Sequence, residues 1–192
     1  MGRTYPHLDE SLRKFIAGQK MFFVATAPLS ADGHVNMSPK GYDSFAVIDD
    51  TTVAYLDLGG SGIETQAHVQ ENGRITIMFC AYDGPANILR LYGQGEAIDF
   101  DHPEFAEMLA LFEGNDRARA VIRIKITRIQ DSCGWGSPFY EFKGERDQLK
   151  RWVDNAASED EWKQRRYDRN ETSIDGLPGL MGKKGQQPQQ ML

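Results

Sequence analysis

Cysteine and long apolar runs are scarce in this sequence of 192 residues, and each shortage excludes a class of protein. The two cysteines, Cys80 and Cys133, lie far apart and form no CxxC pair, so a disulfide framework is not indicated. No segment approaches the roughly 20 apolar residues that cross a bilayer. The N-terminus lacks the apolar core of a secretion signal. These absences predict a cytoplasmic protein with reduced thiols.

Positive charge and known catalytic motifs are also in short supply. The chain carries 22 Lys and Arg against 28 Asp and Glu, a net charge of −6, which argues against a general nucleic-acid surface. The motifs GxSxG and HExxH and the phosphate-binding P-loop do not occur. The histidines are scattered without ligand spacing, so we expect no metal site; they are His7, His34, His68 and His102.

What the sequence does contain is a series of short strand patterns separated by turn residues. Segments rich in β-branched and aromatic residues end at clusters of Gly, Pro, Asn and Asp. The expected strands cover residues 21–27, 34–38, 45–48, 52–58, 74–81, 88–98 and 120–129. Their early connections are too short to cross a parallel sheet. The pattern predicts a mainly β fold with peripheral helices, a small barrel of about six antiparallel strands.

Helical patterns lie between and after these strands. Periodicity and caps predict helices over residues 9–20, 63–71, 101–112, 145–157 and 159–169. Asp9 is the expected cap of the first helix, and Gly73 is expected to stop the second. From about residue 132 the chain continues as a helical C-terminal extension. We expect one domain over residues 1–181 and a disordered tail over 182–192, which is rich in Gly, Gln and Lys.

Two strands carry side chains that a single buried face does not explain. In residues 74–81 both alternating sets are mostly apolar. Such a strand is either covered on both faces, or buried on one face and in a subunit contact on the other. In residues 88–98, Arg90 shares a face with Ile88 and Tyr92. A partly buried Arg needs an anion, which is either a ligand or a structural carboxylate.

The turn Gly59–Gly62 joins an expected strand to an expected helix. Backbone N–H groups at a helix start favour a phosphate, and the hydroxyls of Ser61 and Thr65 would add to them. The alternative is a flexible loop in which Ser61 is an ordinary helix cap. Glu64 weighs against an anion site unless its side chain points away.

A second polar turn runs from Asn36 to Gly41. Asn36, Ser38 and Lys40 would present an amide, a hydroxyl and an ammonium group to a polar ligand, although such a segment is also typical of a surface turn. Cys80 lies in a strand pattern, and we expect it to be a small buried hydrophobic residue. Cys133 has a looser setting, which fits either a pocket or a structural loop.

The order of these elements resembles the pyridoxamine 5′-phosphate oxidase-related proteins, which share an FMN-binding split β-barrel. The resemblance covers roughly residues 10–130. Its motifs are VNMSPKG at 35–41, VAYLDLGGSG at 53–62, ETQAH at 64–68, ENGRIT at 71–76 and ILRLYG at 88–93. Each motif is weak alone, and together they are fairly specific.

The resemblance implies a homodimer with two FMN molecules in grooves between the subunits. It implies that Asn36, Met37, Ser38 and Lys40 line the isoalloxazine or ribityl part. The residues implied at the ribityl and phosphate end are Asp57, Leu58, Ser61, Gly62, Thr65 and Arg90. Chains of this type often have Asn where Ile63 stands, so one polar contact is missing here. Trp135 is a further candidate, as a wall supplied by the other subunit.

The function that the resemblance implies is an FMN-dependent oxidoreductase whose organic substrate and electron donor stay open. The true pyridoxamine phosphate oxidases end in an Arg-containing motif that grips the substrate's phosphate, whereas this sequence ends in Gln189-Gln190-Met191-Leu192. We therefore expect another substrate. Two alternatives are a flavin-binding or sensing module without turnover, and a haem-binding relative with the same barrel.

Overall fold

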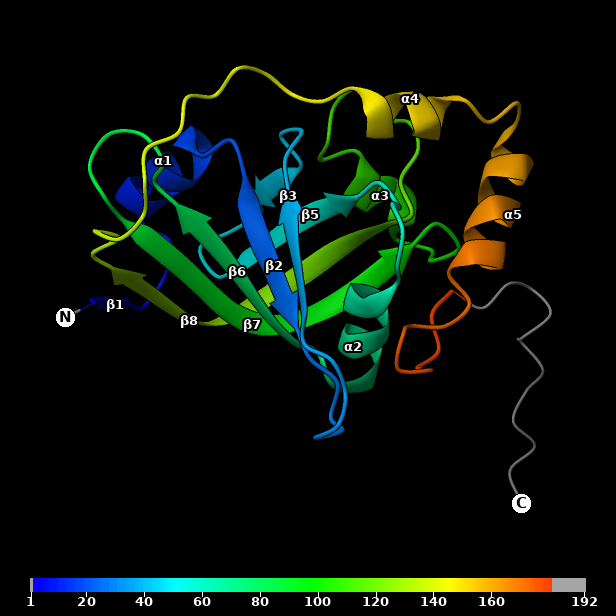
Figure 1. The fold of residues 1–192 in the computed structure, drawn as a ribbon, viewed down its shortest axis with the longest axis horizontal. Helices are drawn as coiled ribbons and strands as arrows, with labels where there is room; N and C mark the ends of the chain where they lie inside the picture. Colours follow the sequence, from blue (N-terminus) through cyan, green and yellow to red (C-terminus); the bar gives the residue numbers. More distant parts are fainter. Residues whose placement is uncertain (1, 181–192) are drawn as a thin grey trace.

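The computed structural model describes residues 2–180 and shows a curled antiparallel sheet with helices around it (Figure 1). The strands are β1 (Thr4–Tyr5), β2 (Phe22–Thr26), β3 (Asn36–Lys40), β4 (Phe45–Val47), β5 (Thr52–Asp57), β6 (Arg74–Cys80), β7 (Ile88–Asp99) and β8 (Ala120–Ser132). Their order across the sheet is β3-β2-β6-β7-β8-β5-β4, and β1 pairs with β8. The predicted fold class is confirmed. The sheet has eight strands rather than about six, partly because two-residue β1 is too short to show alternation.

Five helices lie at the periphery of the sheet. They are α1 (Glu10–Gly18), α2 (Glu64–Asn72), α3 (Phe105–Leu109), α4 (Gln148–Asp154) and α5 (Glu159–Arg169). Helices α4 and α5 lie at the end of the molecule away from β1 (Figure 1). None of the helices within residues 2–180 combines the length and the apolar character that crossing a membrane requires.

The ends of the helices test the expected caps. Asp9 accepts the N–H of Leu12 at 2.9 Å, as predicted for the cap of α1. Gly73 ends α2 with a φ of +71°, the left-handed conformation that favours glycine. The prediction that Ser61 caps α2 was wrong. The cap position belongs to Ile63, and no side chain fills it. Gly62, with a φ of +78°, turns the chain between Ser61 and the helix.

Helix α3 is shorter than the expected helix over residues 101–112. It begins only at Phe105, because local side-chain bonds hold the preceding residues in turns. The carboxylate of Asp99 accepts the N–H of Asp101, and the ring of His102 accepts the N–H of Glu104. Such bonds compete with the helical hydrogen-bond pattern.

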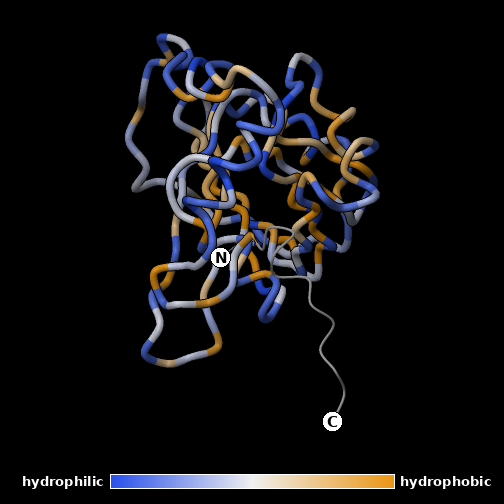
Figure 2. Tube along the Cα trace, turned by 90° about the vertical axis from the view of Figure 1, so that its right-hand side faces the viewer, coloured by the Kyte–Doolittle hydropathy of each residue, from blue (hydrophilic) through white to orange (hydrophobic). Residues whose placement is uncertain are grey.

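The inner face of the curled sheet carries the main core. On β6, Ile75, Ile77 and Phe79 are buried against it, while Thr76 and Met78 on the opposite face are only half-buried. Of the two interpretations of this strand, the structure shows one buried face and one partly open face. Figure 2 shows hydrophobic segments gathered mostly in the middle of the molecule, with hydrophilic loops around them.

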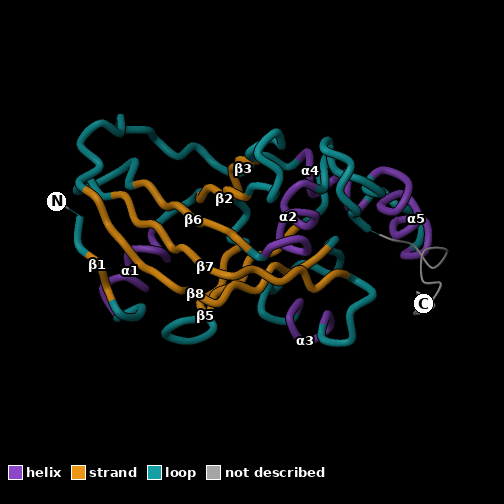
Figure 3. The backbone as a smooth tube through the Cα atoms, turned by 90° about the horizontal axis from the view of Figure 1, so that it is seen from below, coloured by secondary structure: helices purple, strands orange, loops and turns teal. Residues whose placement is uncertain are grey.

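A bulge between β7 and β8 contributes to the curl of the sheet. The register shifts between Tyr92 and Gly93, and a Cβ at Gly93 would lie 2.5 Å from the carbonyl oxygen of Lys125. Only glycine permits this approach, and a bulge increases the local twist. Figure 3 shows the strands crossing obliquely, so that the sheet curves instead of lying flat.

The C-terminal extension runs from the end of β8 around the molecule. An irregular strap, residues 133–147, leads to α4 and α5, and residues 170–180 then return toward α2. Trp162 and Leu180 of this extension form an apolar cluster with Ile63. The segment 182–192, predicted to be a disordered tail, lies outside the described residues.

Candidate functional site

The edge strand β3 presents a polar row to the interior of the curled sheet. Asn36, Ser38 and Lys40 alternate with Met37 and Pro39, so the two sets face opposite sides. The row shares its face with the buried side chains of β2, and its members are half-buried. The predicted set is thus divided, because Met37 is 63% exposed on the outer face.

The polar row meets residues of α2 and β5 across the open side of the sheet. The side-chain nitrogen of Asn36 donates to the hydroxyl of Thr65 at 2.9 Å, and the hydroxyl of Ser38 donates to the side-chain oxygen Oδ1 of Asn36 at 3.4 Å. The ammonium nitrogen of Lys40 lies 5.9 Å from the ring centroid of Tyr55. Four of the predicted residues are therefore together, around a tyrosine that sequence reasoning missed.

Tyr55 is a buried polar group with an unusual setting. Its side chain is fully buried, and its hydroxyl has no hydrogen-bond partner among residues 2–180. Burial raises the pKa of this hydroxyl well above its ordinary value, and the charge of Asp57 raises it further. A buried hydroxyl without a partner is costly. The hydroxyl of Tyr55, whose hydrogen-bonding capacity is unused, therefore lies beside the polar row.

Asp57 forms a buried ion pair with Arg119, a residue that sequence reasoning also missed. The Nη2 of Arg119 lies 2.8 Å from Oδ2 of Asp57, and both side chains are at most 5% exposed. Burial alone would raise the pKa of Asp57, but the charge of Arg119, followed by that of Lys40, holds it well below its usual range. The signal in the sequence was a charge directly before the apolar strand at residue 120.

The Gly59–Gly62 turn is held by its carbonyl groups. Nη1 of Arg166 donates to the carbonyl of Gly59 at 2.7 Å, and Nη1 of Arg119 donates to that of Gly62 at 2.6 Å. Ser61 is exposed at the tip of the turn. Glu64 turns toward the C-terminal extension, where its carboxylate accepts the N–H of Ile174 at 3.3 Å.

Two hydrophobic residues fix the ends of this turn. Leu58 precedes it and packs with Ile98 and Met108, so any contact of Leu58 with a ligand has to come from its backbone. Ile63 follows the turn and is 1% exposed, in contact with the C-terminal extension. The position at which similar chains often carry Asn is here an anchor for that extension.

Arg90 lies on the outer face of the sheet, apart from the polar row. Its Nη1 donates to the hydroxyl of Ser132 at 3.0 Å, and no carboxylate within residues 2–180 pairs with it. In register with Arg90 lie Met78 and Gln130 on the neighbouring strands. The single chain therefore does not bring Arg90 to the other predicted residues.

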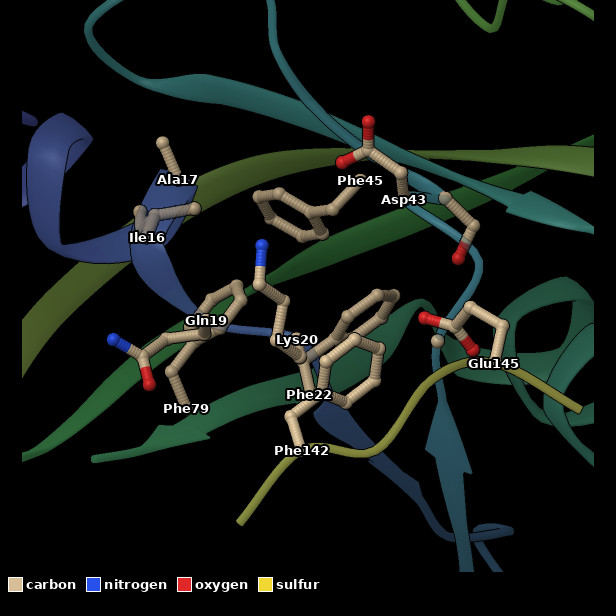
Figure 4. A pocket seen from close by; sticks show the side chains of 12 residues that line it. Ile16, Ala17, Gln19, Lys20, Phe22, Asp43, Phe45, Phe79, Phe142 and Glu145 are labelled. Carbon is tan, nitrogen blue, oxygen red and sulfur yellow. The ribbon is translucent and has the colours of Figure 1, made fainter. Parts of the chain in front are cut away.

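A cavity of about 390 Å³ opens at the end of β3 (Figure 4). Its floor is aromatic, since the ring centroids of Phe22, Phe45 and Phe79 lie 5.0–5.7 Å apart. Phe142 and Glu145 reach it from the strap (Figure 4).

A larger cavity of about 1030 Å³ adjoins the first one. It shares Gly41 and Phe142 with it and is also lined by Pro39 and Lys40 of β3. The polar row thus ends at two spaces of ligand size. Trp135 lies on the same strap, is 85% exposed, and lines neither of these two cavities.

The histidines and cysteines form no further constellation in the described chain. His68 is buried with Nδ1 3.0 Å from the hydroxyl of Thr26, and His34 pairs with Asp175. Cys80 is buried, as predicted, and Cys133 is exposed. Within residues 2–180 no three His, Cys, Asp or Glu side chains gather as a metal site would require.

Comparison with known proteins gives a consistent picture. The family model described as pyridoxamine 5′-phosphate oxidase matches residues 8–133. The pyridoxamine 5′-phosphate oxidase family protein UstO of Aspergillus flavus is 36% identical over 92% of this chain and 77% of its own length. Among solved structures, HupZ of group A Streptococcus has a TM-score of 0.53 at 25% identity, over 65% of this chain and 99% of that one.

A second solved structure supports the fold alone. It is a protein of Lactobacillus delbrueckii that has been assigned as a pyridoxamine 5′-phosphate oxidase. The TM-score is 0.50, with 16% sequence identity over 66% of this chain and 98% of that one. The family match covers strands β2 to β8, the polar row and the Gly59–Gly62 turn, and stops where the strap begins. The chain therefore belongs to the family of pyridoxamine 5′-phosphate oxidase-related proteins with the split-barrel fold.

Proposed function

We propose that this chain is an FMN-dependent oxidoreductase, a cytoplasmic homodimer that holds a flavin between its subunits. The observation that carries the proposal is the row Asn36, Ser38 and Lys40, which faces Thr65 and Tyr55 at the open edge of a split barrel. Membership of the family makes a flavin the ligand to test first.

The residues of the polar row fit the hydrogen-bonding needs of a flavin. Its ring carbonyls and ribityl hydroxyls require donors and acceptors, and Asn36, Ser38 and Lys40 supply both. The ammonium of Lys40 has no carboxylate partner within residues 2–180, and the hydroxyl of Tyr55 has no partner there either. Lys40 would bind and orient the ring system, while Tyr55, which is fully buried, would support it from beneath.

The phosphate end is assigned to the Gly59–Gly62 turn and α2. The hydroxyl of Ser61, the backbone of Gly62 and the hydroxyl of Thr65 would contact the phosphate, with Asp57 and Leu58 shaping the end of β5 beneath the ribityl chain. The carboxylate of Glu64 accepts the N–H of Ile174 and lies beside Gly62, so the phosphate would bind on the side of the turn that carries Ser61. When bound, the flavin would supply the electron transfer, while the chain supplies position and local charge.

The outer face of the sheet is the proposed subunit interface. It carries the half-buried side chains of Phe23, Met78 and Tyr92 together with exposed Met37. Apolar side chains in such number on one open face mark an interaction surface. Because Arg90 and Met37 point to this side, they would reach the cofactor only across the dimer.

The absorption spectrum of the purified protein tests the proposal directly. We expect flavin bands, one FMN per chain after reconstitution, and faster reduction by NADH or NADPH than free FMN shows. Lys40→Ala should weaken FMN binding by about tenfold, the loss expected for one charged hydrogen bond. Lys125→Ala is the matched control, because within residues 2–180 the ammonium of this surface lysine donates only to the hydroxyls of Thr51 and Thr52.

Three outcomes separate the proposal from its alternatives. A colourless protein that binds no FMN at micromolar concentration contradicts the proposal. A yellow protein whose flavin is reduced no faster than free FMN is a binding or sensing module. A Soret band with haem, in place of flavin bands, identifies a haem-binding relative.

A further inference from the structure

The back of the Gly59–Gly62 turn is covered by the C-terminal extension. This segment, residues 148–180, lies outside the part of the chain that matches the family model. Besides the bond from Arg166 to Gly59, the amide of Asn170 donates to the carbonyl of Gly62 at 3.4 Å. A Cβ at Gly179 would lie 2.8 Å from the side chain of Ile63, which shows how closely the extension packs there.

Arg166 is the central contact between the extension and the turn. It is 1% exposed, and its guanidinium carbon lies 3.7 Å from the ring centroid of Trp152. Burial, and then the charge of Arg119, lowers the pKa of Arg166 to about 10. Its Nε has no partner among residues 2–180. A buried cation with a neutral carbonyl as its hydrogen-bond partner is costly, so packing alone gives a poor reason for an arginine here.

The bonds from the arginines fix the direction of two backbone N–H groups. In a trans peptide, the C=O of one residue and the N–H of the next point to opposite sides. Arg166 and Arg119 draw the carbonyls of Gly59 and Gly62 to the back of the turn. The N–H groups of Gly60 and Ile63 are thereby directed to the front, away from the extension.

Charge at the back of the turn acts in the same direction. Among the fully buried side chains there, two guanidinium groups, of Arg119 and Arg166, are offset by the one carboxylate of Asp57. The half-buried carboxylate of Glu64 lies beside Gly62 and accepts the N–H of Ile174. The surplus positive charge is buried, where electrostatic interactions are stronger than in water. It favours an anion at the front of the turn, next to the hydroxyl of Ser61.

We propose that Arg166, together with Arg119, is a positioning residue that makes this site select a phosphorylated flavin over one without phosphate. The C-terminal extension thus contributes to the cofactor site by orienting the Gly59–Gly62 turn, without contacting the cofactor itself. The inference rests on the proposed FMN function for the identity of the ligand.

A comparison of FMN with riboflavin tests the inference, since the two differ only in the phosphate. Wild-type protein should bind FMN more tightly than riboflavin. In Arg166→Met the FMN affinity should fall by about tenfold while the riboflavin affinity stays within about twofold, because the charged hydrogen bond that holds the carbonyl of Gly59 at the back of the turn, and with it the N–H of Gly60 at the front, is lost. Arg166→Lys, which keeps the positive charge, should restore part of the difference.

Arg165→Met is the matched control on the same helix. Arg165 pairs with Glu161 of α5 near the surface and has no hydrogen bond to the turn. This variant should leave both affinities unchanged. If Arg166→Met weakens FMN and riboflavin equally, or weakens neither, Arg166 is a structural residue and the inference is overturned.

A measurement on wild-type protein covers the case in which Arg166→Met does not fold. Coupling between two sites is reciprocal, so an extension that raises the affinity for FMN must itself be stabilised by FMN. Saturating FMN should slow amide hydrogen exchange in residues 148–180 more than saturating riboflavin does. Equal protection by both flavins would overturn the inference. Absence of binding by either flavin would instead contradict the proposed function.

Discussion

Asp57 and Arg119 are two charged side chains inside the protein, and each offsets the energetic cost of burying the other. The Arg119 side chain gives Asp57 two hydrogen bonds, from Nε at 3.2 Å and Nη2 at 2.8 Å, and Gly59 adds a backbone N–H at 3.0 Å. Leaving one buried charge without its partner costs about 3–5 kcal/mol. We expect Arg119→Met to lower the free energy of unfolding by that amount in urea titrations.

Arg123→Met provides the comparison for this prediction. Arg123 lies on β8, four residues after Arg119, but its ion pairs with Glu96 and Glu104 are open to solvent. Its loss should cost at most about 1 kcal/mol. Equal losses for the two variants would contradict the argument that the Asp57 pair is a buried one.

His68 makes stability depend on pH. Burial lowers the pKa of His68 below its ordinary 6.5, so the folded state holds this ring neutral. The unfolded chain takes up a proton at higher pH than the folded chain does. The contribution of His68 is therefore complete above pH 6.5 and is lost as the pH falls through the window below it. In His68→Gln the loss of unfolding free energy between pH 7.5 and pH 5.5 should be smaller. A loss as steep as in the wild type would contradict this role.

At the scale of helices and strands, local sequence patterns predicted which elements the chain forms, and long-range packing determined their exact bounds. The strands over residues 52–58 and 120–129 follow alternation and β propensity, and both were predicted. Helix α3 and the cap of α2 were predicted less well, because side-chain bonds at His102 and the left-handed Gly62 override propensity.

The residues of the candidate site were likewise predictable only in part. Asn36, Ser38 and Lys40 share one face of β3, and Asn36 bonds to Thr65, while the role of these residues toward a cofactor stays a prediction. Arg166 was beyond reach, because no local pattern shows that a helix more than a hundred residues later closes the back of a glycine turn.

The end of α2 offers a test at this scale. Gly73 has a φ of +71°, and an L-residue in the left-handed conformation costs about 1–2 kcal/mol. Gly73→Ala should therefore lower the free energy of unfolding by about that amount, as measured by thermal or urea unfolding. Gly18→Ala, at the end of α1 where a Cβ meets nothing within 4 Å, should instead be neutral or stabilising by up to about 1 kcal/mol. The reverse order of the two variants would refute the cap assignment.

At the scale of the whole molecule, one face of the sheet carries the core with the candidate cofactor site, and the other face is the proposed subunit interface. The inner face carries the core and the polar row, and the outer face carries Arg90 and Met37. Residues predicted for one cofactor therefore lie on opposite sides of a single chain. A second copy that docks on the outer face would explain this division, because its outer-face side chains would then line the groove of the first.

Phe23→Lys tests the subunit interface. Phe23 lies on the outer face, in register with Met78 and Pro39. A charge buried in an apolar contact of two copies is strongly unfavourable. The mass in solution should fall from twice the chain mass of 21.6 kDa to that mass, as measured by light scattering, and FMN binding should weaken with it.

Ile48→Lys is the control for the interface test, since Ile48 is an exposed apolar side chain that follows β4, at the other edge of the sheet from β3. It should leave both the mass and the FMN affinity unchanged. A Phe23→Lys protein that stays dimeric would place the interface elsewhere. A monomer that binds FMN as well as the wild type would show that one chain suffices for the site, and Arg90 and Met37 would then have no part in holding the cofactor.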